Sequence, residues 1–218
     1  DAASVLITHL TELRKRPAGE LLTREDVRAM LEAQKKLTPG VVEELTPSLL
    51  SPGQIQAVLA NLLREQVSVR SFGLILEALA DGAPGTKDLR ALTEQVRQRL
   101  ARSILEPYLD AQGRLSAVTL DPSLERTLAD AVVARGADLS SLPSGFLGRL
   151  VDAIASRLQE VIQRGGEPVL LTRATLRVFL GEALLTAVPG AVVLSYQEAA
   201  VAKGIETVGM VRLEGVPV

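Results

Sequence analysis

One stretch of the chain, residues 51–81, fixes more of the fold than any other. Ser51 is a favourable helix N-cap residue, and Pro52 follows at the first helical position, where a missing N–H costs nothing. The apolar residues that follow recur at helical spacing: Ile55, Val58, Leu59, Leu62 and Leu63. Residues 67–70 interrupt this helix, and a second apolar stripe begins at Leu74. The stretch therefore predicts two amphipathic helices joined by a tight connection.

The rest of the chain up to residue 104 has the same helical character. Thr23 precedes an acidic first turn and predicts a helix that ends near Lys36. Residues 41–45, which lie between two prolines, predict a short helix. A loop rich in glycine and proline ends at Thr86, and from there we expect one long helix to reach residue 104.

After residue 104 the pattern changes to strands that alternate with helices. Runs of strand-forming residues predict four strands, at residues 114–120, 168–172, 191–196 and 205–213. Helical stretches lie between them at residues 122–135, 145–163 and 173–185, and Thr172 is the expected N-cap of the last one. The predicted fold class is α+β: an all-helical part followed by a small α/β part with a roughly four-stranded sheet.

Composition excludes several classes of function. The formal net charge of −2 gives no broad electrostatic attraction to nucleic acid or to an anionic membrane. The absence of cysteine excludes disulfides, thiolate nucleophiles and Cys-ligated zinc. No apolar run approaches the roughly 20 residues that a membrane-spanning helix needs. Because the first residues already follow a helical pattern, we expect the chain to be a fragment of a longer protein, whose other parts can include a membrane segment.

No pattern of catalytic or metal-ligating residues stands out. A Ser-His-Asp triad would need His9, the single histidine, which fits a surface or interface position better. The acidic pairs at residues 25–26 and 43–44 are each expected near a helix start, where negative charge is stabilising. Residues 165–166, two glycines, follow a helix and precede a strand, the reverse of the order in a phosphate-binding loop. The residues alone therefore predict a domain that is not an enzyme and that uses no cofactor or metal.

Several motifs spread over almost the whole chain occur in the order of one known family. They are THLTEL at residues 8–13, ELLTREDV at 20–27, VVEELTP at 41–47, LDPSLE at 120–125 and VLSYQE at 193–198. A single motif of this kind would be weak, whereas the ordered set is specific. The chain resembles the export-gate family of type III secretion, which includes flagellar FlhA and injectisome SctV, in the C-terminal cytoplasmic region of that family.

The resemblance implies a domain organisation. Residues 1–14 are expected to be the truncated end of a preceding subdomain, residues 15–104 a helical ring-forming subdomain, and residues 105–218 an α/β C-terminal subdomain. In the family an N-terminal half with several helices lies in the membrane. The implied location is therefore the cytoplasmic face of the bacterial inner membrane, with membrane contact only through that missing half.

The resemblance also implies a function without catalysis. The family forms a docking platform for export substrates and chaperone–substrate complexes, and the stretch LLSPGQIQ at residues 49–56 favours the flagellar branch. The implied partners are other copies of the chain in a ring, nine-membered in the family, together with chaperone–substrate complexes and other export-apparatus proteins. The alternative is the same platform in a virulence-type injectisome. A soluble enzyme domain whose site lies outside this sequence, and a stand-alone helical adaptor, are further alternatives.

Four residues are candidate site residues under this resemblance. Thr8 matches the family's threonine that lines a chaperone-facing cleft between the first two subdomains. Because other walls of that cleft belong to a subdomain outside this sequence, we expect the chain alone to bind chaperones poorly. A threonine in a helix can equally bond back to its own turn. Arg64, Glu65 and Arg70 are candidate ring contacts, although a solvated surface explains their charges equally well.

Overall fold

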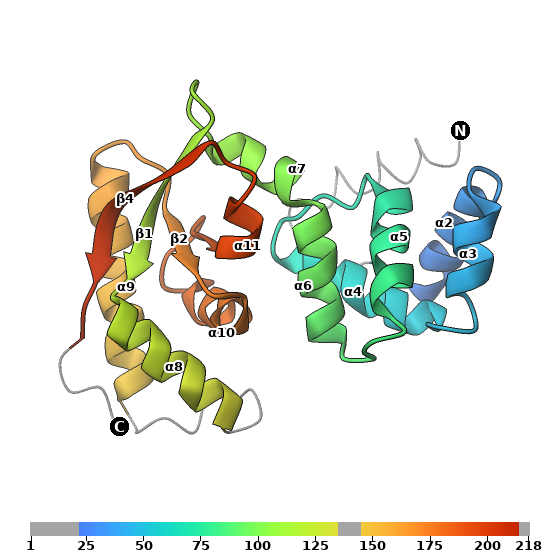
Figure 1. Ribbon diagram of the computed structural model, residues 1–218, viewed down its shortest axis with the longest axis horizontal. Coiled ribbons are helices and arrows are strands. Elements are labelled where there is room, and N and C mark those ends of the chain that lie inside the picture. The colour runs from blue at the N-terminus through green and yellow to red at the C-terminus, as the bar shows by residue number, and fades with distance from the viewer. Residues whose placement is uncertain (1–21, 135–144, 214–218) are drawn as a thin grey trace. The chain divides into compact units, whose positions relative to one another are not determined.

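The computed structural model describes residues 22–134 and 145–213 (Figure 1). The chain divides into two compact units between Leu100 and Ala101. The described part of the first unit is helical, as predicted. Its helices are α2 (Arg24–Lys35), α3 (Pro39–Leu45), α4 (Pro52–Arg64), α5 (Phe72–Gly82) and α6 (Leu89–Arg99).

Two capping boxes fix the helix starts that the sequence predicted. The Thr23 hydroxyl accepts a hydrogen bond from the Asp26 amide at 3.1 Å, and the Asp26 carboxylate accepts one from the Thr23 amide at 2.8 Å. Ser51 and Gln54 form the same reciprocal pair, and Pro52 occupies the first turn of α4. Each box satisfies two backbone N–H groups that would otherwise lack partners at a helix N-terminus.

The two amphipathic helices predicted from residues 51–81 are present as α4 and α5. Their apolar stripes form much of the buried core of the first unit, through Ile55, Val58, Leu59, Leu62, Ile75, Ala78 and Leu79. The connection between them is held in place because Val67 and Val69 are also buried. Burial of this apolar surface is the main stabilising contribution to the packing of the helices.

Two predictions for this part of the chain are wrong in detail. The long helix expected from Thr86 starts later, because the Asp88 carboxylate caps it by accepting from the Arg90 amide at 3.0 Å. It also ends earlier, since Leu100 leaves the helical region, and α7 (Ala101–Leu105) follows as a separate helix. The acidic pair at residues 43–44 lies in the last turn of α3 rather than near its start, because Pro39 is already the first helical residue.

The second unit is built on a four-stranded sheet whose paired strands are all parallel. The strand order is β3-β2-β1-β4, with β1 (Arg114–Leu120), β2 (Val169–Thr172), β3 (Val192–Ser195) and β4 (Gly204–Val211). A 3₁₀ turn, Glu106–Tyr108, precedes the first strand. The helices are α7, α8 (Pro122–Ala134), α9 (Phe146–Gln163), α10 (Ala174–Leu184) and α11 (Tyr196–Ala199). The predicted fold class and all four predicted strands are confirmed.

Helices cover the two faces of this sheet in separate layers (Figure 1). On one face Val118, Leu170 and Val193 pack against α8, α9 and α10. On the other face Leu115, Leu171 and Leu194 pack with Leu105 of α7 and Ala199 of α11. The side chains of successive strand residues therefore enter different cores, as the alternation of a pleated strand requires.

The connections that follow β2 and β3 leave the sheet on opposite faces. The connections from β1 to β2 and from β2 to β3 run through α8, α9 and α10 on the first face. The connection from β3 to β4 runs through α11 on the second face and returns to the free side of β1. The carboxyl ends of the neighbouring strands β2 and β3 thus continue into helices on opposite faces of the sheet.

The expected role of Thr172 as a helix cap is wrong. Thr172 lies inside β2 and is fully buried, and its hydroxyl donates a hydrogen bond to Glu125 of α8 at 2.8 Å. The N-cap position of α10 falls on Arg173, whose side chain makes no capping hydrogen bond. The Thr172 hydroxyl binds Glu125 of α8 and no backbone amide of α10. The N-terminus of α10 therefore has no side-chain cap.

Candidate functional site

The candidate ring-contact residues lie around the C-terminal end of α4. Arg64 is the last residue of α4, Glu65 is its C-cap, and Arg70 follows the turn that leads to α5. Arg64 and Arg70 are exposed. Thr8, the candidate cleft residue, lies outside the described residues. The structure thus brings Arg64 and Glu65 together at one helix end and leaves Arg70 on the next segment.

Glu65 differs from its two arginine neighbours because it faces its own unit. Its Oε2 lies 2.6 Å from Nη1 of Arg97, in the last turn of α6. The Arg97 side chain is only 2% exposed and that of Glu65 is 23% exposed. An ion pair of this kind is sheltered from solvent and links α4 to α6. Among the described candidates, Arg64 and Arg70 are the ones directed mainly to solvent.

A second group of polar residues gathers at the carboxyl ends of β2 and β3. Glu125 of α8 is 5% exposed, and its Oε1 accepts hydrogen bonds from the Thr172 hydroxyl at 2.8 Å and the Arg173 amide at 2.9 Å. The other carboxylate oxygen lies 3.5 Å from Nε of Arg173. Glu125 therefore ties the first turn of α8 to the junction between β2 and α10.

The neighbouring junction, between β3 and α11, is held by its own capping box. The Ser195 amide donates to the Glu198 carboxylate at 2.7 Å, and the Ser195 hydroxyl accepts from the Glu198 amide at 3.2 Å. Tyr196 follows and is 37% exposed. Its burial and then the charge of Glu125 raise the pKa of Tyr196 above its usual value, while Arg173 acts in the opposite sense. The tyrosine hydroxyl thus stays protonated and able to donate at neutral pH.

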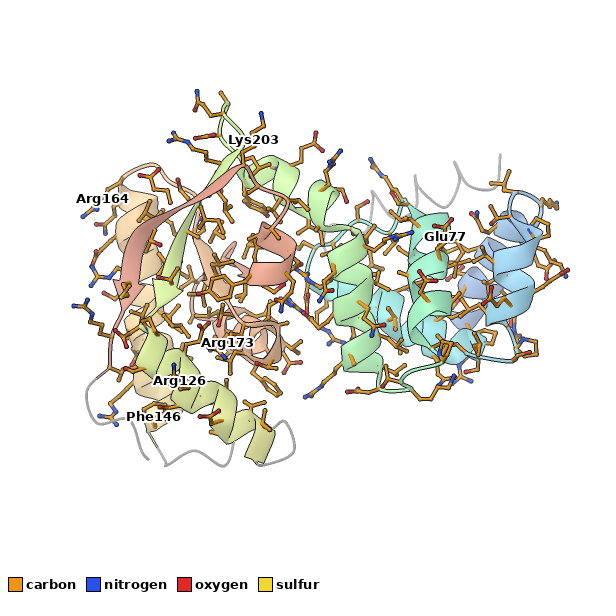
Figure 2. All side chains as sticks on the ribbon, viewed as in Figure 1. Glu77, Arg126, Phe146, Arg164, Arg173 and Lys203 are labelled. Atoms are coloured by element: carbon orange, nitrogen blue, oxygen red, sulfur yellow. The ribbon has the colours of Figure 1, made fainter. Side chains whose placement is uncertain are left out.

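A shallow crevice lies where these two junctions meet. Its volume is about 370 Å³, and it is lined by Arg173, Ala174, Thr175 and Gln197. Figure 2 shows Arg173 at this end of the sheet, beside α10. The lining offers a guanidinium group, an amide and a hydroxyl, which suit recognition of a polar group more than bond-breaking chemistry.

The crevice was not predicted from the sequence, although two sequence signals for it exist. One is an arginine directly after a strand that is buried along its whole length, as Arg173 is. The other is the pattern Ser-x-x-Glu at residues 195–198, a capping box that starts a helix directly at the end of a strand. Together they mark two helix starts at one edge of a parallel sheet.

Metal ligation and membrane insertion find no support in the described ranges. Within residues 22–134 and 145–213, no three or more side chains of His, Cys, Asp or Glu are grouped so as to hold a metal ion. In the same ranges no helix combines the length and the apolar character needed to cross a bilayer.

Comparison with known proteins points to one family. The FHIPEP family matches residues 1–203. The flagellar biosynthesis protein FlhA of Borreliella burgdorferi is 37% identical over 199 residues, which cover 91% of this chain and 28% of that protein. The chain thus spans less than a third of the length of this relative.

Solved structures share the fold. The structure of the Chlamydia pneumoniae CdsV and CdsO protein complex matches with a TM-score of 0.81 and 28% identity, over 96% of this chain and 62% of that one. The nonameric SctV-C of EPEC matches with a TM-score of 0.76 and 23% identity, over 93% of this chain and 61% of that one, and shows the same fold. The resemblance to FlhA and SctV proteins is confirmed, and the chain belongs to the FHIPEP family.

Proposed function

We propose that the chain is the cytoplasmic portion of a type III protein-export gate and acts as a docking platform for export substrates and chaperone–substrate complexes in flagellar assembly. The observation that carries the proposal is the family match over residues 1–203. The 37% identity to a flagellar FlhA favours the flagellar system. The likeness to CdsV supports the second candidate, the same platform in an injectisome. In either system the platform binds and positions polypeptides and carries no catalytic activity.

The platform is proposed to work as a ring of identical chains. The nonameric assembly of EPEC SctV-C supports this arrangement, since the two chains share a fold. In the proposed division, residues 15–104 form the ring-forming subdomain, residues 105–218 form the C-terminal one, and residues 1–14 end a preceding one. Arg64, Glu65 and Arg70 remain the candidate ring contacts, and Arg64 and Arg70 are the exposed members of this set.

The proposed location is the cytoplasmic face of the bacterial inner membrane. The matched FlhA is much longer than this chain, and the N-terminal half of such a protein is proposed to supply the membrane anchor. Other proteins of the export apparatus are proposed to bind the platform, a view supported by the complex of CdsV with CdsO.

The test of docking uses the full-length protein, because the proposed chaperone cleft includes a subdomain outside this sequence. The purified protein is titrated with its cognate chaperone–substrate complex, beside Thr8→Met and the matched control Thr207→Met, an exposed threonine of β4. We expect saturable binding that Thr8→Met weakens by about tenfold, as for loss of one well-packed contact, and that Thr207→Met leaves unchanged.

Two results would contradict this proposal in different ways. No binding by folded full-length protein would remove docking as the function and leave ring scaffolding as the better explanation. Equal weakening by Thr8→Met and Thr207→Met would keep docking and exclude Thr8 from the cleft.

A further inference from the structure

The crevice between β2 and β3 lies at the position where open α/β sheets bind their ligands. Two neighbouring strands there lead at their carboxyl ends into helices on opposite faces, which leaves a hollow between the two connections. In this unit β2 leads to α10 on one face and β3 leads to α11 on the other. A crevice of about 370 Å³, lined by residues of both connections, lies there. Topology and the observed cavity thus mark the same place.

Arg173 has its hydrogen-bonding end free for a ligand. Its backbone amide donates to Glu125, and its Nε lies 3.5 Å from the Glu125 carboxylate. Its two terminal nitrogens have no acceptor among the described residues, and half of the side chain is exposed. Glu125 thus holds the Nε end of the guanidinium group, and Arg173 is one of the residues that line the crevice.

Further donors line the crevice beside this fork. The first backbone bonds inside α10 come from the Leu176 and Arg177 amides to the Arg173 carbonyl, at 2.9 and 3.0 Å. The amides of Ala174 and Thr175 precede them and have no acceptor within the helix, and no side chain caps this end. The Thr175 hydroxyl and the Gln197 amide complete the lining. The residues that line this small space therefore carry four different kinds of donor.

The chemistry of these donors favours a carboxylate. A guanidinium fork matches the two oxygens of a carboxylate in geometry. Because Glu125 already balances the charge of Arg173, the site carries little excess positive charge and is poorly suited to a doubly charged phosphate. The crevice is shallow and open, so it can admit a side chain that belongs to a longer polypeptide, and the exposed ring of Tyr196 offers an apolar contact nearby.

We propose that this crevice binds the carboxylate of an acidic side chain on a partner polypeptide. Arg173 donates hydrogen bonds to the two carboxylate oxygens. The same oxygens accept further hydrogen bonds from the Thr175 and Gln197 side chains and from the first amides of α10. For a docking platform this gives the C-terminal unit a contact for an acidic segment. The inference itself rests on the crevice alone, and its test needs neither a ring nor a chaperone.

The first measurement follows the backbone amides of the chain by NMR during titration with a peptide. The probe is the blocked tripeptide acetyl-Ala-Glu-Ala-amide, and the matched probe carries Gln in place of Glu. We expect saturable shifts of the Ala174 and Thr175 amides and of the Gln197 side chain with the Glu peptide alone. Equal shifts with both peptides would overturn the proposal. So would a lack of saturation at concentrations on the order of 50 mM, because a two-point guanidinium–carboxylate contact supported by further donors should bind in that range.

Variants then assign the site. Arg173→Gln is expected to weaken binding about tenfold, the loss typical of one charge-assisted hydrogen bond. The control is Arg164→Gln, an exposed arginine that precedes β2 and so lies at the opposite end of the strand from Arg173 (Figure 2). An equal loss with Arg164→Gln would show a general charge effect and overturn the site.

A second variant keeps the test valid should Arg173→Gln disturb Glu125. Thr175→Val removes one hydroxyl from the crevice and leaves every contact of Glu125 in place. A several-fold loss is expected from it, and unchanged binding by both variants would overturn the proposal. Tighter binding of inorganic phosphate than of the Glu peptide would overturn the assignment of a carboxylate. None of these results bears on chaperone docking, so the two proposals fail separately.

Discussion

At the scale of single residues, Gln66 holds the turn that ends α4. Its backbone has a φ of 59°, in the left-handed region. Its amide donates to the Leu63 carbonyl at 3.1 Å, and the next amide, of Val67, donates to the Leu62 carbonyl at 2.8 Å. This pair of bonds is the Schellman arrangement, and the buried Val67 supplies the apolar contact that accompanies it. A residue with a Cβ is strained here, because the Cβ crowds the following carbonyl oxygen.

We therefore expect Gln66→Gly to stabilise the protein. Glycine removes the strain at positive φ, and the free energy of unfolding should rise by about 1 kcal/mol. The matched control is Gln98→Gly, at an exposed position inside α6, which should lower it by about 1 kcal/mol. Urea unfolding of the three proteins measures both changes. A loss of stability in both variants would show that the turn at residue 66 carries no strain.

The polar partners of the candidate site could not be found from local sequence. A threonine directly before a helical stretch is a common cap signal, which made Thr172 a reasonable candidate. Its partner is Glu125, 47 residues away, and the contact exists because β1 and β2 lie side by side. Spacing along the chain predicts which residues share a helix face. It does not predict which strands become neighbours, and so it misses Glu125 and the crevice.

At the scale of elements, the apolar periodicity located the described helices and strands well. The strand β2 starts one residue later than predicted, and β3 starts one residue later and ends one residue earlier. Both strands are located this closely because clear turn or cap residues bound them. The long helix expected over residues 86–104 failed for a different reason. Leu92, Val96 and Leu100 continue a helical spacing up to the break, so the apolar pattern does not show that α6 ends at Arg99. That end coincides with the division between the units.

The pairing of α4 with α6 provides a test at this scale. Glu65→Gln removes a carboxylate charge that lies 2.6 Å from the buried Arg97, and we expect a loss of roughly 2 kcal/mol in the free energy of unfolding. The matched control is Glu77→Gln (Glu77 is labelled in Figure 2), which breaks the exposed pair of Glu77 with Arg99 at 3.5 Å. Such a pair contributes little, and its loss should cost under about 0.5 kcal/mol.

Denaturant unfolding compares these two variants under the same conditions. Equal small losses in the free energy of unfolding would show that Glu65 contributes no more to stability than an exposed surface charge does. In that case its ion pair with Arg97 would not be a stabilising link between the helices.

At the scale of the whole molecule, two compact units meet in the sequence at residues 100–101. The change from helical spacing to alternating strands indicated a division near this point. The finer division into residues 15–104 and 105–218 comes from the family resemblance and stays a proposal. Assembly into a ring belongs to this scale as well, because it concerns how complete chains meet.

Charge reversal tests the proposed ring contacts. Changing Arg64 and Arg70 together to Glu in the full-length protein should shift the assembly toward single chains. The reason is that two positive charges at the proposed interface become negative and repel the groups that the arginines would attract. Sedimentation velocity measures the size of the assembly. The control is Arg126→Glu, an exposed arginine of α8 in the other unit, which should leave the size unchanged. An unchanged assembly in the double variant would place the ring contacts elsewhere.

The position of β4 has a consequence for synthesis on the ribosome. The first strand of the sheet pairs on one side with the last, so that Arg114 lies opposite Gly204. During translation β1 can pair early with β2, but its other edge stays unpaired until β4 has left the exit tunnel. A nascent chain that stops before Gly204 therefore exposes an unpaired edge of a largely apolar strand, the kind of surface that pairs with other chains. Only the finished polypeptide shields its own first strand.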